Sequence, residues 1–253
     1  MRTITAFVLT FLASISSVAK ELKLLETIPF ADGERFVYEA RLSKFPFYGK
    51  VGELAFETQR LNGRWRFSCE ARSKGFLTKL VGVKVNYRFS STVDTDLGLL
   101  TTEKDLDDSK RHVVMRADVS RECRWIRWQS RDLRHPEKLL QSKEREVPYW
   151  VTDTLAGIYV CRYSKLDAPI VLPVTDNGEL YEIEIAPVGR KTVETEFGKY
   201  TALEIDVKVF GKLLRRSGSL RIWLSDDLKR IPLMAQVKGS FGTITFHLVE
   251  MKK

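Results

Sequence analysis

The stretch from Leu220 to Glu250 constrains the fold most strongly, because it predicts three consecutive short strands. Residues Leu220 to Leu224 alternate between two sets of side chains, which is the period of a strand with one buried face. Ser225-Asp226-Asp227 interrupts that period with short side chains that favour turns. A second strand, Leu233 to Lys238, begins after Pro232, and a third contains Ile244, Phe246 and Leu248 in alternation. Such a meander needs further strands beside it and a core to cover.

The same alternation recurs along most of the chain. It is clearest from Arg64 to Ala71, where the apolar side chains of Trp65, Phe67 and Cys69 point one way. Asn62-Gly63 and Asp176-Asn177-Gly178 supply hairpin turns. Further strands are predicted at Glu34 to Leu42, Val51 to Gln59, Val81 to Phe89, Leu99 to Lys104, Arg111 to Val119, Glu122 to Trp128, Ala168 to Val174, Leu180 to Arg190, Thr192 to Glu196 and Thr201 to Phe210. We therefore predict a mainly β protein, an antiparallel curved sheet that forms a barrel or half-barrel.

One segment predicts a helix. Thr152-Asp153 provides good N-cap residues, and Val151, Leu155, Ile158 and Tyr159 follow at helical spacing up to about Tyr163. Its apolar stripe is expected to pack against the sheet, as the one main α-helix of the fold. The polar stretch from Ser130 to Glu146 predicts a long loop or a short exposed helix.

The amino terminus predicts export. Arg2 is followed by an apolar run from Ala6 to Leu12 and then by Ser17-Val18-Ala19, small residues typical of a cleavage site. We interpret residues 1–19 as a signal peptide cleaved after Ala19; the alternative is a membrane anchor, for which the run is short. The mature chain is then expected to be periplasmic or secreted, without a transmembrane segment, and residues 20–253 to form a single β-rich domain.

The charge leaves the partner open. Lys and Arg outnumber Asp and Glu by 42 to 33, which gives a formal net charge of +9. Such an excess suits an anionic envelope surface, but it also simply keeps a protein soluble. Export makes nucleic acid an unexpected partner.

Three cysteines, Cys69, Cys123 and Cys161, allow two interpretations. Cys69 and Cys123 both lie in predicted strands and could form a disulfide in an exported protein. Alternatively, the cysteines are free and serve as small apolar side chains.

No pattern of residues predicts a catalytic or metal centre. Asp226 and Asp227 are adjacent carboxylates, but in a strand such neighbours face opposite sides, so a turn role is favoured over acid–base chemistry. His112, His135 and His247 stand singly, without the spacing of metal ligands. We therefore predict no cofactor and no enzymatic activity.

The run from Arg121 to His135 is unusual because arginines interleave with tryptophans. Arg124 and Arg127 could contact phosphate, and Trp125 and Trp128 suit a membrane interface. The functional interpretation is a docking edge for an anionic lipid headgroup or glycan. The alternative is an ordinary strand with Trp inward and Arg outward, continuing into a solvated loop.

Four blocks of sequence resemble a known family. They are Gly33 to Glu39, Thr152 to Tyr159, Thr195 to Leu203, and Leu220 to Asp227 continuing through Arg230-Ile231-Pro232-Leu233. Together they are similar to the bacterial exported family called domain of unknown function 3108. In the third block Glu196-Phe197 replaces the family's usual Pro-Ala. The resemblance implies a β-rich protein of the bacterial envelope, similar to the half-barrels that transport lipoproteins or lipids through the periplasm, and it implies no known reaction.

The leading functional hypothesis is a non-enzymatic binding or carrier protein for a lipid or other hydrophobic small molecule. The aromatic residues on strand faces are expected to line its cavity, with cationic residues near the rim; these are Trp65, Phe67, Tyr87, Phe89 and Phe246. A densely packed core would explain the same aromatics. The second hypothesis is a structural or interaction module that holds a protein or an anionic glycan. The third is a hydrolase that uses Asp226 or Asp227.

Overall fold

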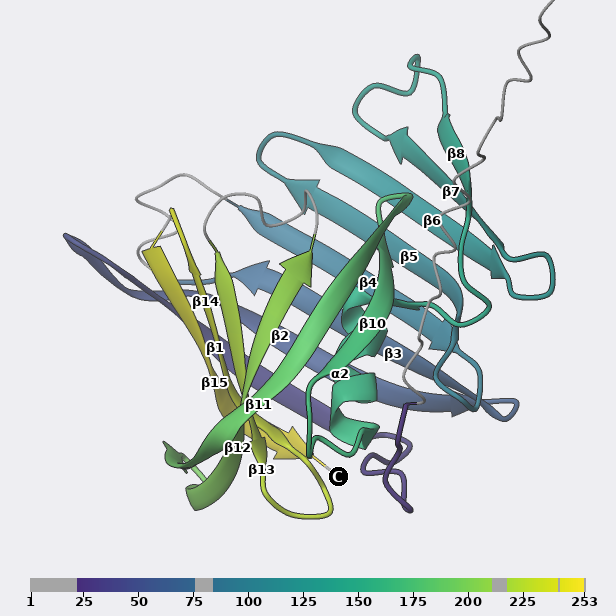
Figure 1. Ribbon diagram of the computed structural model, residues 1–253. Coiled ribbons are helices and arrows are strands. Elements are labelled where there is room, and N and C mark those ends of the chain that lie inside the picture. The colour runs from purple at the N-terminus through teal and green to yellow at the C-terminus, as the bar shows by residue number, and fades with distance from the viewer. Residues whose placement is uncertain (1–21, 76–83, 211–217, 241, 253) are drawn as a thin grey trace, which may run out of the picture.

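The computed structural model describes residues 22–75, 84–210, 218–240 and 242–252. Within these ranges the chain forms a sheet of 15 strands and one helix (Figure 1). The first eight strands are β1 (Arg35–Lys44), β2 (Phe47–Leu61), β3 (Arg64–Ser73), β4 (Val85–Val93), β5 (Leu99–Asp108), β6 (His112–Ser120), β7 (Trp125–Asp132) and β8 (Gln141–Glu146). The others are β9 (Thr152–Asp153), β10 (Ile170–Asp176), β11 (Glu179–Thr195), β12 (Gly198–Phe210), β13 (Ser219–Ser225), β14 (Pro232–Gly239) and β15 (Gly242–Lys252), and the helix is α2 (Thr154–Tyr163). The predicted signal peptide, residues 81–83 of a predicted strand and residue 241 of the last predicted turn lie outside the described residues.

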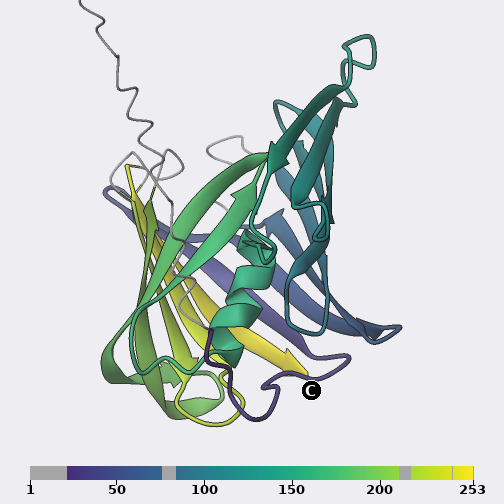
Figure 2. The ribbon, with the colours of Figure 1, turned by 45° about the vertical axis from the view of Figure 1, so that its right-hand side comes forward.

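The strands form a meander in which most sequence neighbours pair antiparallel. The sheet order is β8-β7-β6-β5-β4-β3-β2-β1-β15-β14-β13-β12-β11-β10-β9, so β1 pairs with the last strand, β15, and joins the two halves of the chain. Only β9 and β10 are parallel among the described pairs. The sheet curves around α2 and remains open between β8 and β9 (Figures 1 and 2). The prediction of a curved antiparallel sheet with one helix is confirmed, in its half-barrel form.

Side chains bridge the open seam of the half-barrel. Lys143 and Arg145 of β8 lie 3.2 and 2.6 Å from the Glu179 carboxylate at the start of β11. Lys104 of β5 pairs with Asp176 at the end of β10. Between these pairs, Gly178 has a φ of +75°, in the left-handed region that favours glycine, and an added Cβ would meet Trp128 at 3.2 Å. Side-chain contacts, and not strand pairing, therefore hold the β10–β11 turn against the opposite side of the seam.

The helix begins where the sequence predicts. The Asp153 carboxylate caps it by accepting a hydrogen bond from the amide of Ala156 at 2.8 Å. Its second oxygen accepts from the hydroxyl of Ser91 on β4 at 2.5 Å. Burial raises the pKa of Asp153, against hydrogen bonds that favour its charged form. The cap thus fixes the start of α2 to the inner face of the sheet.

The main core lies between α2 and the inner face of the sheet. Phe30, from the segment before β1, contacts the rings of Trp65, Phe67 and Tyr159 edge-on at 5.1 to 5.5 Å. Phe67 and Tyr159 stack at 3.6 Å. A smaller core includes Trp223 and Leu233, so β13 buries side chains on both of its faces. The period-two argument predicted only one buried face for this strand.

The structure differs from prediction in two other places. Residues 130–146 contain the end of β7 and the edge strand β8 instead of a loop or a helix. All six residues of β8 are exposed, so burial imposes no alternation on its sequence, and pairing with β7 alone defines the strand. In addition, β11 is one long strand with an irregularity between Pro187 and Gly189, where two strands were predicted.

Candidate ligand-binding cavity

An apolar cavity of about 200 Å³ lies between α2 and the inner face of the sheet. The strands that contribute to it are β1, β2, β13, β14 and β15. It is lined by Phe36, Tyr38, Leu54, Phe56, Thr154, Ile158, Tyr159, Arg162, Leu220, Ile222, Pro232, Met234, Ala235 and Phe246. Several of these, including Ile158, Leu220 and Phe246, are only half-buried.

The size of the cavity limits what it can hold. It exceeds the roughly 150 Å³ of an apolar cavity that accommodates benzene. It is smaller than the roughly 300–1,000 Å³ typical of pockets for drug-sized ligands. The space therefore suits a ring or a short length of hydrocarbon rather than an entire lipid.

Arg162 of α2 is the charged residue of the cavity wall, and its charge is neutralised within the protein. Its side chain is fully buried, and its two terminal nitrogens contact the Glu34 carboxylate at 2.5 and 3.0 Å. It also donates to the carbonyl oxygens of Pro29, Lys229 and Arg230 at 3.0 to 3.1 Å. Such a bidentate, hydrogen-bonded pair is the form in which a buried charge is tolerated. The wall of the cavity is thus mostly hydrocarbon, and its one charged side chain, Arg162, is paired with Glu34.

The polar groups of the two tyrosines in the wall are also occupied. The Tyr38 hydroxyl donates to the carbonyl of Pro232 at 2.6 Å, and burial raises the pKa of Tyr38. The Tyr159 hydroxyl accepts from Thr58 at 3.2 Å, and burial raises the pKa of Tyr159 to about 12. Both phenols are therefore neutral at ordinary pH, and both hydroxyls are hydrogen-bonded within the protein.

The five predicted aromatic residues are not brought together. Phe246 lines the cavity. Trp65 and Phe67 are buried in the main core instead. Tyr87 and Phe89 contact each other at 6.2 Å on β4, and the Tyr87 hydroxyl donates to Asp108.

The arginine and tryptophan residues of the predicted docking edge mostly contact neighbouring protein groups. Arg127 lies over the ring of Trp125 at 5.1 Å and pairs with Glu144 of β8 at 2.6 Å. Trp128 is buried in the main core, under the ammonium of Lys143 at 5.7 Å. Arg124 is exposed in the turn before β7, with a φ of +55°. The acidic residues of β8, in a stretch predicted as a long loop or a short exposed helix, thus neutralise part of this edge.

Asp226 and Asp227 have structural partners. Asp227 accepts from the Ser225 hydroxyl at 2.7 Å and from the amides of Lys229 and Arg230 at 2.9 and 3.1 Å. Burial opposes its ionisation, but these hydrogen bonds outweigh burial and lower the pKa of Asp227. Asp226 accepts from Arg190 at 2.6 Å. The two carboxylates stabilise the β13–β14 turn, which is the role that the sequence favours.

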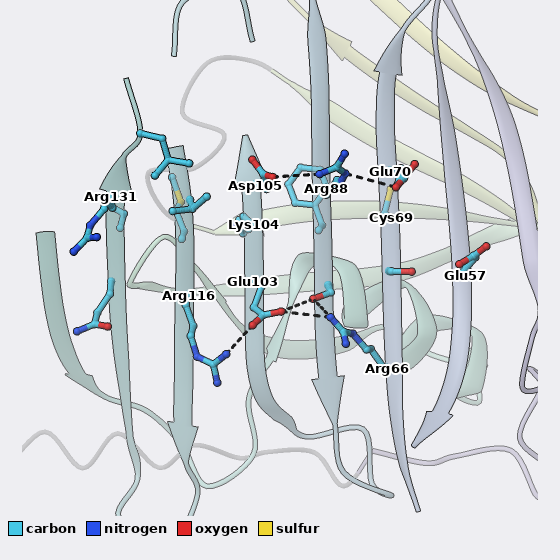
Figure 3. A pocket seen from close by; sticks show the side chains of 18 of the residues that line it. Glu57, Arg66, Cys69, Glu70, Arg88, Glu103, Lys104, Asp105, Arg116 and Arg131 are labelled. Atoms are coloured by element: carbon cyan, nitrogen blue, oxygen red, sulfur yellow. Dashed lines mark hydrogen bonds and ion pairs between the residues drawn. The ribbon is translucent and has the colours of Figure 1, made fainter. Parts of the chain in front are cut away.

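A larger hollow of about 770 Å³ lies on the opposite, outer face of the sheet, across β1 to β7 (Figure 3). Its side chains pair with one another: Glu103 lies 3.4 Å from Arg66 and 2.7 Å from Arg116. Arg88 lies between Asp105 and Glu70, at 3.5 and 3.7 Å. This hollow has the regular cross-strand charge pairing of a solvated sheet face. Among the residues that the structure describes, no three His, Cys, Asp or Glu side chains are grouped so as to hold a metal.

The sequence analysis missed the role of Arg162. The residue lies three positions after Tyr159 and seven after Leu155, so it extends the apolar stripe of α2. The sequence signal for a buried ion pair was an arginine within an apolar stripe, together with Glu34, an acid that follows Gly33. Phe36, Tyr38, Leu54 and Phe56 lie in predicted strands, but a strand pattern does not reveal that space remains between these side chains and α2.

Comparisons with known proteins support the fold. A family model described as protein of unknown function (DUF3108) matches residues 37–249. A β-barrel-like protein of domain of unknown function DUF1849 from Brucella abortus has a TM-score of 0.57 and 9% identity, over 91% of this chain and 98% of its own. A protein with a YmcC-like fold from Bacteroides fragilis has a TM-score of 0.34 and 9% identity, over 92% of this chain and 100% of its own. The search of curated proteins found no match. The Brucella protein is similar in fold alone, and in the described part of the chain no helix is long and apolar enough to cross a membrane.

Proposed function

Because the chain belongs to the DUF3108 family, whose function is unknown, we propose its function from the cavity itself: it binds the apolar part of a lipid or similar molecule, without catalysis. The observation that supports this most directly is an apolar space whose one charged wall residue, Arg162, is already paired with Glu34. Such a wall favours hydrocarbon over a polar or charged group.

The position of the cavity also fits a carrier. Leu220 and Phe246 are half-buried, so a hydrocarbon group has a route from the solvent along the inner face of the sheet. The remainder of a longer ligand lies outside the 200 Å³ space, against that face. The apolar run before Ser17-Val18-Ala19 supports an exported protein, in the periplasm or outside the cell.

Filling the cavity tests this proposal. Ala235 lines it, whereas Ala186 is equally half-buried on β11 beside the outward-facing Asp206. In titrations with a fluorescent long-chain fatty acid, Ala235→Trp should weaken binding by about tenfold or more, because the indole occupies the hydrocarbon space. Ala186→Trp should bind as the wild type does. Equal binding by both variants, with native circular dichroism, would contradict the proposal.

Two further measurements guard against an ambiguous result. If Ala235→Trp does not fold, Ala235→Leu removes less space and should give a smaller loss in the same direction. Native mass spectrometry of the gently purified wild type should show a bound lipid mass that the folded Ala235 variant lacks. A wild type that is free of lipid and does not bind the fatty acid would exclude a hydrophobic ligand.

The exposed strand β8 favours a second candidate, an interaction module for an envelope protein or an anionic glycan. All six of its residues are exposed, and its side away from β7 has no strand partner among the described residues. Edge strands of this kind can pair with an extended segment of another protein. Photo-crosslinking from Ser142 should then capture a protein or glycan, while Ala235→Trp should leave that product unchanged.

A further inference from the structure

The hairpin between β1 and β2 exposes three aromatic rings at its tip. Phe45 is 85% exposed, Tyr48 60% and Phe47 42%. Single exposed apolar side chains are common on soluble proteins, but adjacent large ones at a projecting tip indicate a contact surface. In Figure 1 this hairpin reaches farther to the left than the ends of β14 and β15.

The surroundings of these rings are cationic. Lys44 precedes Phe45, and its ammonium donates to the carbonyl of Ser240 at 3.2 Å, which places the end of β14 beside the hairpin. Lys238 of β14 is exposed at the same end of the strands. Among residues 42–50, 236–240 and 242–245, no Asp or Glu is present to neutralise either lysine. Lys50 differs, because it pairs with Glu39 and Glu53.

Exposed rings beside unneutralised lysines suit one partner in particular. Aromatic side chains, tyrosine above all, partition to the boundary between lipid headgroups and acyl chains. Lysine is attracted to anionic headgroups and extends its apolar stem toward the membrane. We propose that the β1–β2 tip docks this protein on the surface of a membrane that contains anionic lipids.

The tip and the cavity belong to the same strands. Phe246 lines the cavity and lies four residues along β15 from Gly242, a distance of about 13 Å in an extended strand. Docking through the hairpin would therefore bring the inner face of the half-barrel close to the lipid. Docking itself needs no bound ligand, so this inference goes beyond the proposed function and does not depend on it.

Co-sedimentation of the full chain with vesicles tests the inference. Wild-type protein should sediment with vesicles of phosphatidylethanolamine and phosphatidylglycerol, and less with pure phosphatidylcholine. The double variant Phe45→Ser/Tyr48→Ser should reduce the bound fraction by about fivefold or more, because the rings no longer enter the interface. Lys44→Glu/Lys238→Glu should abolish the preference for phosphatidylglycerol, and raising salt from about 0.1 to 0.5 M should weaken wild-type binding.

Leu139→Ser/Leu228→Ser is the matched control, since these side chains are 91% and 84% exposed elsewhere on the surface. It should bind vesicles as the wild type does. Equal binding by the tip variant and this control, or no binding of the wild type to anionic vesicles, would overturn the inference.

The two proposals fail separately. Ala235→Trp should still sediment with anionic vesicles, and Phe45→Ser/Tyr48→Ser should still bind the fatty acid in solution. A wild type that sediments with anionic vesicles but binds no fatty acid contradicts the proposed function alone, and a wild type that binds the fatty acid but no anionic vesicles contradicts the docking tip alone. A tip variant whose circular dichroism is not native is replaced by Phe45→Ser alone, at the most exposed position.

Discussion

Arg162 links three segments that are distant in the sequence. Its guanidinium contacts Glu34 before β1, and it donates to the carbonyl oxygens of Lys229 and Arg230 in the β13–β14 turn. Arg162→Met should lower the free energy of unfolding by about 3–5 kcal/mol, because it leaves the Glu34 carboxylate buried without its partner. Urea denaturation followed by circular dichroism measures this loss.

Arg127→Met is the comparison for that experiment. Arg127 and Glu144 are 2.6 Å apart, almost as close as the buried pair, but their side chains are 50% and 58% exposed. Solvent screens such a pair, so the same substitution should cost about 0–1 kcal/mol. Similar losses for the two variants would show that burial of the Arg162 pair is not what matters.

Asp108 should contribute a pH-dependent part of the stability. The Tyr87 hydroxyl, followed by the amide of Lys110, lowers the pKa of Asp108 from 3.8 to about 2. A carboxyl whose pKa is lowered by folding stabilises the protein above its unfolded pKa, and this contribution is lost as the pH falls from about 4 through about 2. Asp108→Asn should therefore show a shallower fall in melting temperature across that range.

Tyr87→Phe is the companion variant for Asp108, because it removes the principal hydrogen bond to the carboxylate. It should flatten the same part of the pH profile while retaining the aromatic contact with Phe89. A wild-type slope in both variants would contradict this origin of the acid sensitivity.

At the scale of elements, the start of α2 depends on a short side chain with a hydrogen-bond acceptor. Asp153→Ala should cost about 0.5–2 kcal/mol through loss of the N-cap to Ala156. Asp153→Asn keeps an acceptor oxygen and removes a buried charge, so it should remain within about 1 kcal/mol of the wild type. Thermal unfolding of the two variants distinguishes them, and an Asn variant as unstable as the Ala variant would show that the charge is required.

The sequence predicts an element well where burial is one-sided. Strand β3 and the cap of α2 are examples, since Trp65 and Phe67 are buried in alternation and Asp153 precedes the apolar stripe. Strand β8 was not predicted, because all its side chains are exposed to water and only its pairing with β7 defines it as a strand. The cavity was not predicted for another reason: its volume depends on how far α2 stands from strands more than 50 residues away in sequence, which no local pattern encodes.

At the scale of the whole molecule, charged side chains bridge the open seam. Lys143, Arg145 and Glu179 are at least one-third exposed, so each of these pairs adds little stability by itself. What keeps the two sheet edges together is then the shared core around α2, to which strands from both halves of the chain contribute. The half-barrel should therefore unfold as a unit, as expected if the chain forms one domain.

Thiol reactivity tests that cooperativity. All three cysteines are free; Cys123 is exposed, while Cys69 on β3 and Cys161 on α2 are buried. Burial raises the pKa of both Cys69 and Cys161 to about 12, so few thiolates form and reagent cannot reach them. A disulfide-exchange reagent at about pH 8 should therefore modify Cys123 rapidly and the other two only upon unfolding. Cys69 and Cys161 should become reactive at the same urea concentration, because the sheet and α2 share one core; exposure of Cys161 at a lower concentration would mean that the helix leaves a sheet that remains folded.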